Sequence, residues 1–282
     1  MLLTRNFQPS AALSPFISRY NIFSSDTPGF ELSDFSLADS AALCLTWGDW
    51  WIEASPGTWR RLPGITFAGP ASRAIRIHMK SPCQLIAISF RPSGWKALFQ
   101  RPANEFADSV MPFADLWPKS ASCLDEAMLN DSEPRKIIQT VEDEIIRHLS
   151  GIGSWEADEA MLMFEHIAQI DSTRQVKDVA AQLGLSPRQF ERHCLAHFGH
   201  SPKLVLRRSR FLDMASVLRG LGSASNEQLA ELRYFDQSHR NREFKKFIGM
   251  TPQQFVQAPT PLFTPALRMR LLPNAEAERV RG

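Results

Sequence analysis

An internal repeat near the end of the sequence, with an offset of fifty residues, restricts the fold more than any other feature. Each copy has a short apolar helical segment, a tight turn, a second helical segment rich in basic side chains, and a Gly-x-Ser/Thr-Pro stop. The matched positions include Arg192 with Arg242, Gly199 with Gly249 and Ser201 with Thr251. Two short helices joined by a tight turn, occurring twice, predict an all-helical domain of two helix-turn-helix modules.

The first copy contains several signals for the start of a helix. Gly184 lies in the turn, Ser186 is placed as the N-cap and Pro187 as the first helical residue. Gln189 completes a capping box with Ser186, in which each side chain bonds the other residue's backbone N–H group. In the second copy Asp236 takes the N-cap position. We therefore expect two helices with exposed N-termini, which can donate backbone N–H groups to phosphate.

The sequence divides into a β-rich first part and a helical second part. Apolar runs such as "AALCLTWGDWWIEA" and "QLIAISF", separated by Gly-Pro and Ser-Pro pairs, predict strands, and "SGIGS" at 150–154 is a candidate linker. We expect an α+β protein. Its β-rich sensor or dimerisation domain at 1–150 would be barrel- or jelly-roll-like with a helical extension. The paired helix-turn-helix domain would occupy 155–258, and residues 259–282 would form a disordered tail.

Charge is distributed unevenly, although the whole chain carries only +2. Residues 1–170 hold 14 Lys and Arg against 20 Asp and Glu, a balance of −6, whereas residues 171–282 hold 18 against 10, a balance of +8. This difference predicts a polyanionic partner for the C-terminal part. Four cysteines without a C-x-x-C pair predict a reducing cytoplasm. No apolar run reaches about 18 residues, so we expect no membrane span.

Catalytic and metal-binding patterns have little support in the sequence. It has no G-x-S-x-G, phosphate-loop or dinucleotide fingerprint, so we expect no enzymatic activity and no cofactor. His193 and His197 are one helical turn apart, as metal ligands can be. Cys194 between them matches Phe244 of the second copy, which is expected in the core, so we expect no metal site.

A resemblance to a known family rests on two long motifs. The segments "VAAQLGLSPRQFERHCLAHFGHSPKLVLRRSRFLDMASVLR" and "DQSHRNREFKKFIGMTPQQF" resemble the paired helix-turn-helix domain of the AraC/XylS family of bacterial transcription regulators. The segments "PFISRY", "FAGPASRAIRI" and "PFADLWP" resemble the N-terminal domain of a poorly characterised subgroup of that family. The resemblance implies a DNA-binding regulator, more often an activator of transcription, with double-stranded DNA and, for an activator, RNA polymerase as partners.

In helix-turn-helix geometry the first turns of each second helix enter successive major grooves. The side chains that face away from the core there, onto which the family's base-reading positions map, are Arg188, Glu191, Arg192, Gln237, Ser238, Asn241 and Arg242. Glu191 is either an acceptor for cytosine or a support for the neighbouring arginines. The expected phosphate contacts are Lys203, Arg207, Arg208, Lys245 and Lys246.

Three residues of the second copy depart from the family pattern. Arg233 replaces the usual turn glycine, Leu229 replaces a small alanine, and Arg240 stands where an apolar residue would match Phe190 of the first copy. They support a second hypothesis, in which the N-terminal domain is an enzyme or binds a small molecule and the DNA-binding domain is degraded and weakly specific.

Trp47, Trp50 and Trp51, with Arg76, form the candidate pocket for a small-molecule effector, because indole rings can line an apolar cavity. The alternative for the same tryptophans is ordinary packing in the core. The sequence also leaves a homodimer open.

Overall fold

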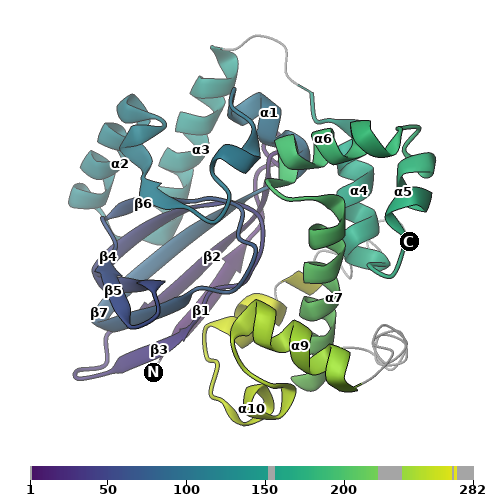
Figure 1. Cartoon of the computed structure of the whole chain (residues 1–282). Helices are drawn as coiled ribbons and strands as arrows, with labels where there is room; N and C mark the ends of the chain where they lie inside the picture. The colour runs from purple at the N-terminus through teal and green to yellow at the C-terminus, as the bar shows by residue number, and fades with distance from the viewer. Residues whose placement is uncertain (1, 152–155, 222–236, 269, 272–282) are drawn as a thin grey trace, which may run out of the picture.

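The computed structural model describes residues 2–151, 156–221, 237–268 and 270–271. An antiparallel sheet with two long helices forms the N-terminal domain, and helices form the C-terminal domain (Figure 1). This arrangement confirms the α+β fold class predicted from the sequence. No helix within the described residues is long and apolar enough to cross a membrane.

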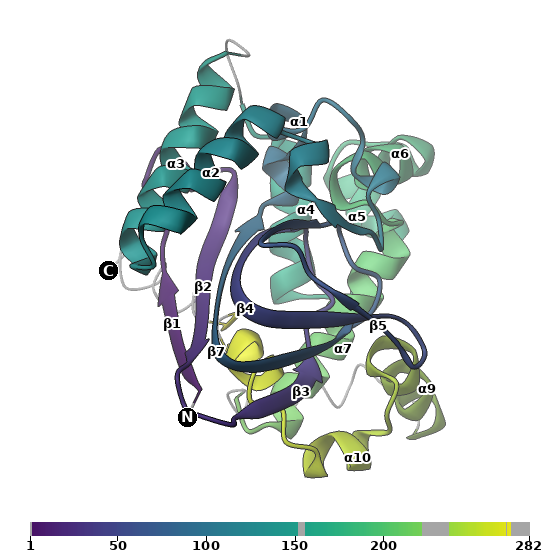
Figure 2. The ribbon, with the colours of Figure 1, turned by 90° about the vertical axis from the view of Figure 1, so that its left-hand side faces the viewer.

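The sheet of the N-terminal domain is strongly curved (Figure 2). Its strands are β1 (Leu3–Phe7), β2 (Ile17–Ser25), β3 (Glu31–Phe35), β4 (Ala42–Ser55), β5 (Thr58–Arg61), β6 (Ile65–Ala68), β7 (Arg76–Phe90) and β8 (Val110–Pro112). Their order is β1-β2-β7-β4-β6-β8, with β3 paired to the first part of β7 and β5 to the last part of β4. A bulge at Gly48 bends β4, and only glycine fits there, because its φ is +80° and a Cβ would lie 2.2 Å from the Pro82 carbonyl oxygen.

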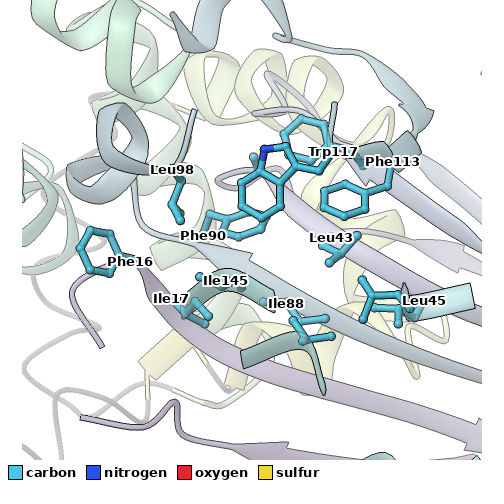
Figure 3. Packing of buried hydrophobic residues seen from close by; sticks show 14 of the residues in the cluster. Phe16, Ile17, Leu43, Leu45, Ile88, Phe90, Leu98, Phe113, Trp117 and Ile145 are labelled. Atoms are coloured by element: carbon cyan, nitrogen blue, oxygen red, sulfur yellow. The ribbon is translucent and has the colours of Figure 1, made fainter. Parts of the chain in front are cut away.

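The main core of this domain lies between the sheet and two helices, α2 (Pro118–Asn130) and α3 (Pro134–Ser150). Figure 3 shows strand residues such as Leu43 and Ile88 packing against Trp117, the N-cap residue of α2, and Ile145 of α3. Short segments join the sheet to these helices: η1 (Pro92–Gly94), α1 (Trp95–Leu98), η2 (Ala103–Glu105) and η3 (Phe113–Asp115). Alternate residues of β7, such as Ile86 and Ile88, thus meet residues one helical turn apart in α3, such as Val141 and Ile145, in one core.

The C-terminal domain has one helical module at each end of a long helix. The first module contains α4 (Glu159–Ile170), α5 (Val176–Gln182) and α6 (Pro187–Phe198), and α7 (Pro202–Leu218) leads to α9 (Gln237–Ile248) and α10 (Pro252–Gln257). Figure 1 places α6 and α9 at opposite ends of α7, whose 17 residues rise about 25 Å. Cys194 and Phe244, which match in the repeat, are both fully buried, so both copies use this position for their core.

The prediction of a disordered tail from residue 259 is wrong for the part that the structure describes. Residues 263–268 are helical, and Phe263 and Leu267 are fully buried in the core of the second module. The carboxylate of Asp34 in β3 accepts hydrogen bonds from the backbone N–H groups of Leu262, at 2.6 Å, and Phe263, at 3.0 Å. The segment is ordered because the N-terminal domain caps this helix and the second module buries its apolar face. Residues 272–282 lie outside the described range.

Candidate DNA-binding surface

The start of α6 is held in place by the predicted capping box. The N–H group of Gln189 donates to the Ser186 hydroxyl at 3.3 Å, and the N–H group of Ser186 donates to Gln189 Oε1 at 3.0 Å. Phe190, on the inner face, is fully buried and contacts the Phe164 ring edge-on, with centroids 4.8 Å apart. The helix is therefore fixed at its first turn and along its inner face.

The opposite face of α6 carries the predicted base-reading residues of the first module. Arg188, Glu191 and Arg192 are all exposed, within the first two turns after the N-cap. The structure thus brings these three polar side chains together on one solvent-facing surface. The first turn of α6 contains no acidic residue, and Glu191 in the second turn is the one carboxylate within the helix.

The second recognition helix, α9, has the same inner and outer faces. Phe244, Phe247 and Ile248 are buried, and Phe244 contacts the Phe211 ring of α7 edge-on, with centroids 5.1 Å apart. Of the predicted base-reading residues, Gln237, Ser238 and Arg242 are exposed and Asn241 is half-buried. Asp236, Arg233 and Leu229 lie outside the described residues.

Arg240 stands at the position in α9 that matches Phe190. It is half-buried, and its Nε is a buried donor without a hydrogen-bond partner in the described part of the chain. An unsatisfied buried donor costs free energy, so the conflict that the sequence predicts at this position persists in the structure.

Of the five predicted phosphate contacts, three lysines are exposed and two arginines, Arg207 and Arg208, are not. Lys203 in the first turn of α7 and Lys245 and Lys246 in the last turn of α9 are exposed. Arg207 is half-buried, and its Nε donates to Glu243 of α9 at 3.2 Å. Glu243 is only 4% exposed, so the ion pair is largely shielded from solvent. The pair joins α7 to α9 and thereby orients the second module.

Arg208 does not face solvent, so its predicted role as a phosphate contact is wrong. Its side chain is buried against the N-terminal domain, where its guanidinium donates to the carbonyl oxygens of Ala71, at 2.8 Å, and Asp39, at 3.2 Å. The helical periodicity of α7 alone does not reveal this, because the surface that covers Arg208 comes from the sheet domain.

The N-terminal domain also contacts the end of α6 directly. The rings of His197 and His200 hydrogen-bond to the carbonyl oxygens of Pro92, at 3.0 Å, and Pro70, at 3.1 Å. Burial lowers the pKa of both imidazoles, so the neutral form is favoured in the folded protein. Gly199 between them has a φ of +74°, and a Cβ there would lie 2.9 Å from the Pro70 ring. The glycine of the Gly-x-Ser-Pro stop therefore permits both the turn and the close contact.

Two further contacts attach α4 and α9 to the sheet domain. Glu165 of α4 accepts from Arg91 at 2.7 Å and from the Ser93 hydroxyl at 3.1 Å. The N–H group of Ala74 donates to the Phe247 carbonyl oxygen at 2.8 Å. Both modules of the C-terminal domain are therefore fixed to the same N-terminal domain.

The tryptophans predicted to line an effector pocket lie in three different environments. Trp50 is 2% exposed and its Nε1 donates to the carbonyl oxygens of Trp47 and Gln84, so it is a core residue. Trp47 packs against the main core, and its Nε1 donates to the Met128 carbonyl oxygen at 3.3 Å. Trp51 lies beside the His78 ring, with centroids 5.4 Å apart. The described structure therefore does not support a shared pocket for these three indoles.

Arg76, the fourth member of that predicted pocket, lies over the Trp59 ring, with its guanidinium carbon 5.4 Å from the ring centroid. It lines a cleft of about 190 Å³ between the sheet domain and the end of α9. Arg73, Lys245 and Lys246 also line this cleft, and Glu53 pairs with Arg76 at 3.5 Å. The cleft is thus a basic surface shared by the two domains.

Comparisons with known proteins agree with this arrangement. Residues 179–258 match a helix-turn-helix domain family of the AraC type, and residues 5–112 match a domain of unknown function, DUF6597. No curated protein matches the chain.

Solved structures show a distant similarity. ToxT from Vibrio cholerae is 12% identical, with a TM-score of 0.45 over 84% of this chain and 97% of that chain. Wild-type ToxT from Vibrio cholerae strain SCE256, bound to an unsaturated fatty acid, is 11% identical, with a TM-score of 0.43 over 86% and 96%. The AraC-like transcriptional activator CuxR is 14% identical, with a TM-score of 0.27 over 81% and 91%.

The family matches cover both the sheet domain and the region of the two recognition helices. Residues 179–258, which include the capped α6 and its repeated partner α9, therefore form a helix-turn-helix domain of the AraC type, and the sheet domain carries the DUF6597 match.

Proposed function

We propose that this protein is a sequence-specific transcription regulator that reads double-stranded DNA through α6 and α9. The observation that supports this most directly is the outer face of α6. Its Arg188, Glu191 and Arg192 are exposed on a helix that the capping box and Phe190 hold rigid. Arginine side chains fixed in this way can each form two hydrogen bonds with guanine in the major groove.

The second module would read the adjacent groove through Gln237, Ser238, Asn241 and Arg242. Support comes from α7, which separates the modules by a rise of about 25 Å, and from the Arg207–Glu243 ion pair, which fixes α9 against α7. Lys203, Lys245 and Lys246 would contact phosphates and position the domain without selecting a sequence.

Control would come from the N-terminal domain. Because this domain contacts α4, α6, α7 and α9, a ligand that prefers one arrangement of these contacts would shift the DNA-binding geometry. These contacts support an effector-responsive regulator, and a protein that reads bacterial DNA in this way would act in the cytoplasm. RNA polymerase would be a further partner if the response is activation, and a homodimer would double the number of modules.

The proposal is tested by DNase footprinting of the DNA upstream of the protein's own gene, followed by competition binding with the protected site and random DNA. Arg192→Ala should weaken binding to the site by about 1–3 kcal/mol and leave binding to random DNA nearly unchanged. Arg5→Ala, an exposed arginine on the sheet domain, is the matched control and should change neither. A steep salt dependence without any preferred site would instead support a degraded reader.

A further inference from the structure

A small cavity lies between the two domains, and it is rich in arginine. Its volume is about 50 Å³. The N-terminal wall includes Arg19 of β2 and the neighbouring Asp39, and the C-terminal wall includes Gln169 of α4, Arg208 of α7 and Arg270. The cavity is separate from the exposed face of α6 and from the tryptophans of the sheet.

The charged groups around this cavity do not balance. Arg19 pairs with Asp39 at 2.6 Å, Arg270 with Asp213 at 2.9 Å, and Glu165 is held by Arg91 at 2.7 Å. Arg208 donates to backbone carbonyl oxygens, and among the residues that line the cavity three arginines, Arg19, Arg208 and Arg270, stand against two carboxylates, Asp39 and Glu165. Although burial alone would raise the pKa of Asp39, the positive charges of Arg19, Arg208 and Arg270 hold it below its ordinary value.

One donor at the cavity also lacks a partner. Arg19 is only 7% exposed, and its Nε is buried without a hydrogen-bond partner in the described part of the chain. A buried cationic group with an unused N–H is unfavourable unless an acceptor completes it. The guanidinium group bonds best to oxyanions, which can accept two parallel hydrogen bonds.

The size of the cavity limits what can bind. At about 10–15 Å³ for each water-sized occupant, it holds a group of a few heavy atoms. We propose that this cavity binds one small oxyanion, either a free ion or the anionic group of an effector, and that the bound oxyanion connects β2 to α4 and α7. The regulatory consequence of this site rests on the proposed DNA-binding function, whereas the binding itself does not.

Thermal unfolding of the full-length protein tests the site without DNA. Phosphate, sulfate, acetate and hexanoate replace chloride at constant ionic strength, and the melting temperature is followed as each is titrated. We expect a saturable rise with at least one oxyanion. Similar apparent affinities for acetate and hexanoate would identify a free small ion, and tighter hexanoate binding would identify the anionic end of a larger molecule.

Variants separate the site from general salt effects. Arg19→Gln should weaken the apparent affinity at least tenfold, whereas Arg61→Gln, which removes an exposed arginine paired with Asp49 at 2.6 Å, should retain it. Sulfate and phosphate also stabilise proteins by exclusion from their surface. An equal rise in the wild type and in Arg19→Gln, or no saturable rise, would overturn the proposal.

A second variant avoids loss of the Arg19–Asp39 pair. Gln169 is half-buried and lines the cavity, so Gln169→Glu supplies a carboxylate attached to the protein. It should raise the melting temperature without added oxyanion and remove most of the response to it; an unchanged response would count against the site. If the oxyanion tests give negative results, the proposal that α6 reads DNA is unaffected. If Arg192→Ala does not alter DNA binding, the oxyanion titration still tests the cavity.

Discussion

Arg208 and Lys203 lie on the same helix, and substitution of each by alanine distinguishes a structural role from a phosphate contact. Arg208 forms two charge-assisted hydrogen bonds to carbonyl oxygens of the sheet domain. Each such bond contributes about 1.5–3 kcal/mol, and both acceptors would be left buried. Removal of the charge also relieves its desolvation and its repulsion from Arg270, which offsets part of the loss. We therefore expect Arg208→Ala to lower the free energy of unfolding by about 2–4 kcal/mol.

Lys203→Ala should affect the salt dependence of DNA binding and leave stability almost unchanged. Because Lys203 is exposed, its removal should change the free energy of unfolding by less than about 0.5 kcal/mol. It should reduce the slope of log affinity against log salt concentration by about one phosphate contact.

The assay combines urea unfolding, followed by tryptophan fluorescence, with DNA binding at several salt concentrations. Arg208→Ala should leave the salt slope unchanged once the fraction of folded protein is taken into account. If Arg208→Ala keeps wild-type stability and loses one unit of slope, the burial of Arg208 against the sheet domain is the wrong account of this residue.

Three further predictions follow from individual contacts. Phe263→Ala should destabilise the protein by about 3–5 kcal/mol in urea unfolding, because Phe263 is fully buried; a disordered tail would give almost no change. Burial lowers the pKa of His197 and His200 below the ordinary 6.5, so stability should be complete above pH 6.5 and fall as the unfolded chain takes up protons below it; His197→Asn with His200→Gln should flatten this dependence. Arg240→Phe should stabilise the protein by about 1.5–3 kcal/mol, since it removes an unsatisfied donor and adds apolar burial; a less stable variant would show that the arginine has a necessary partner.

The sequence predicted local features well where the determining residues are close together. The start of α6 depends on Ser186, Pro187 and Gln189, which lie within four residues, and the structure has the complete capping box. The match of Cys194 with Phe244 likewise predicted two buried positions, because the same helical face recurs in both copies.

Features that depend on the other domain were not predictable from local patterns. The acceptors of Arg208 lie 137 and 169 residues upstream, and Asp34, which caps the last described helix, is separated from Leu262 by 228 residues. A usable signal existed only for that helix, because Phe263 and Leu267 are spaced by one helical turn. No local pattern in the sequence singles out Arg19 and Arg270, because their importance depends on their lining the same cavity between the two domains.

The contacts of the sheet domain couple the two recognition helices to each other. The sheet domain holds α6 through His197 and His200, α7 through Arg208, and α9 through the bond from Ala74 to Phe247. It therefore sets the orientation of both modules, whereas α7 and the Arg207–Glu243 pair connect them directly. If α6 and α9 read successive grooves, a small shift of the sheet domain changes the angle between these two recognition helices. Such a change alters affinity for a fixed half-site spacing without altering any base-reading side chain, so effector response and sequence preference can vary independently.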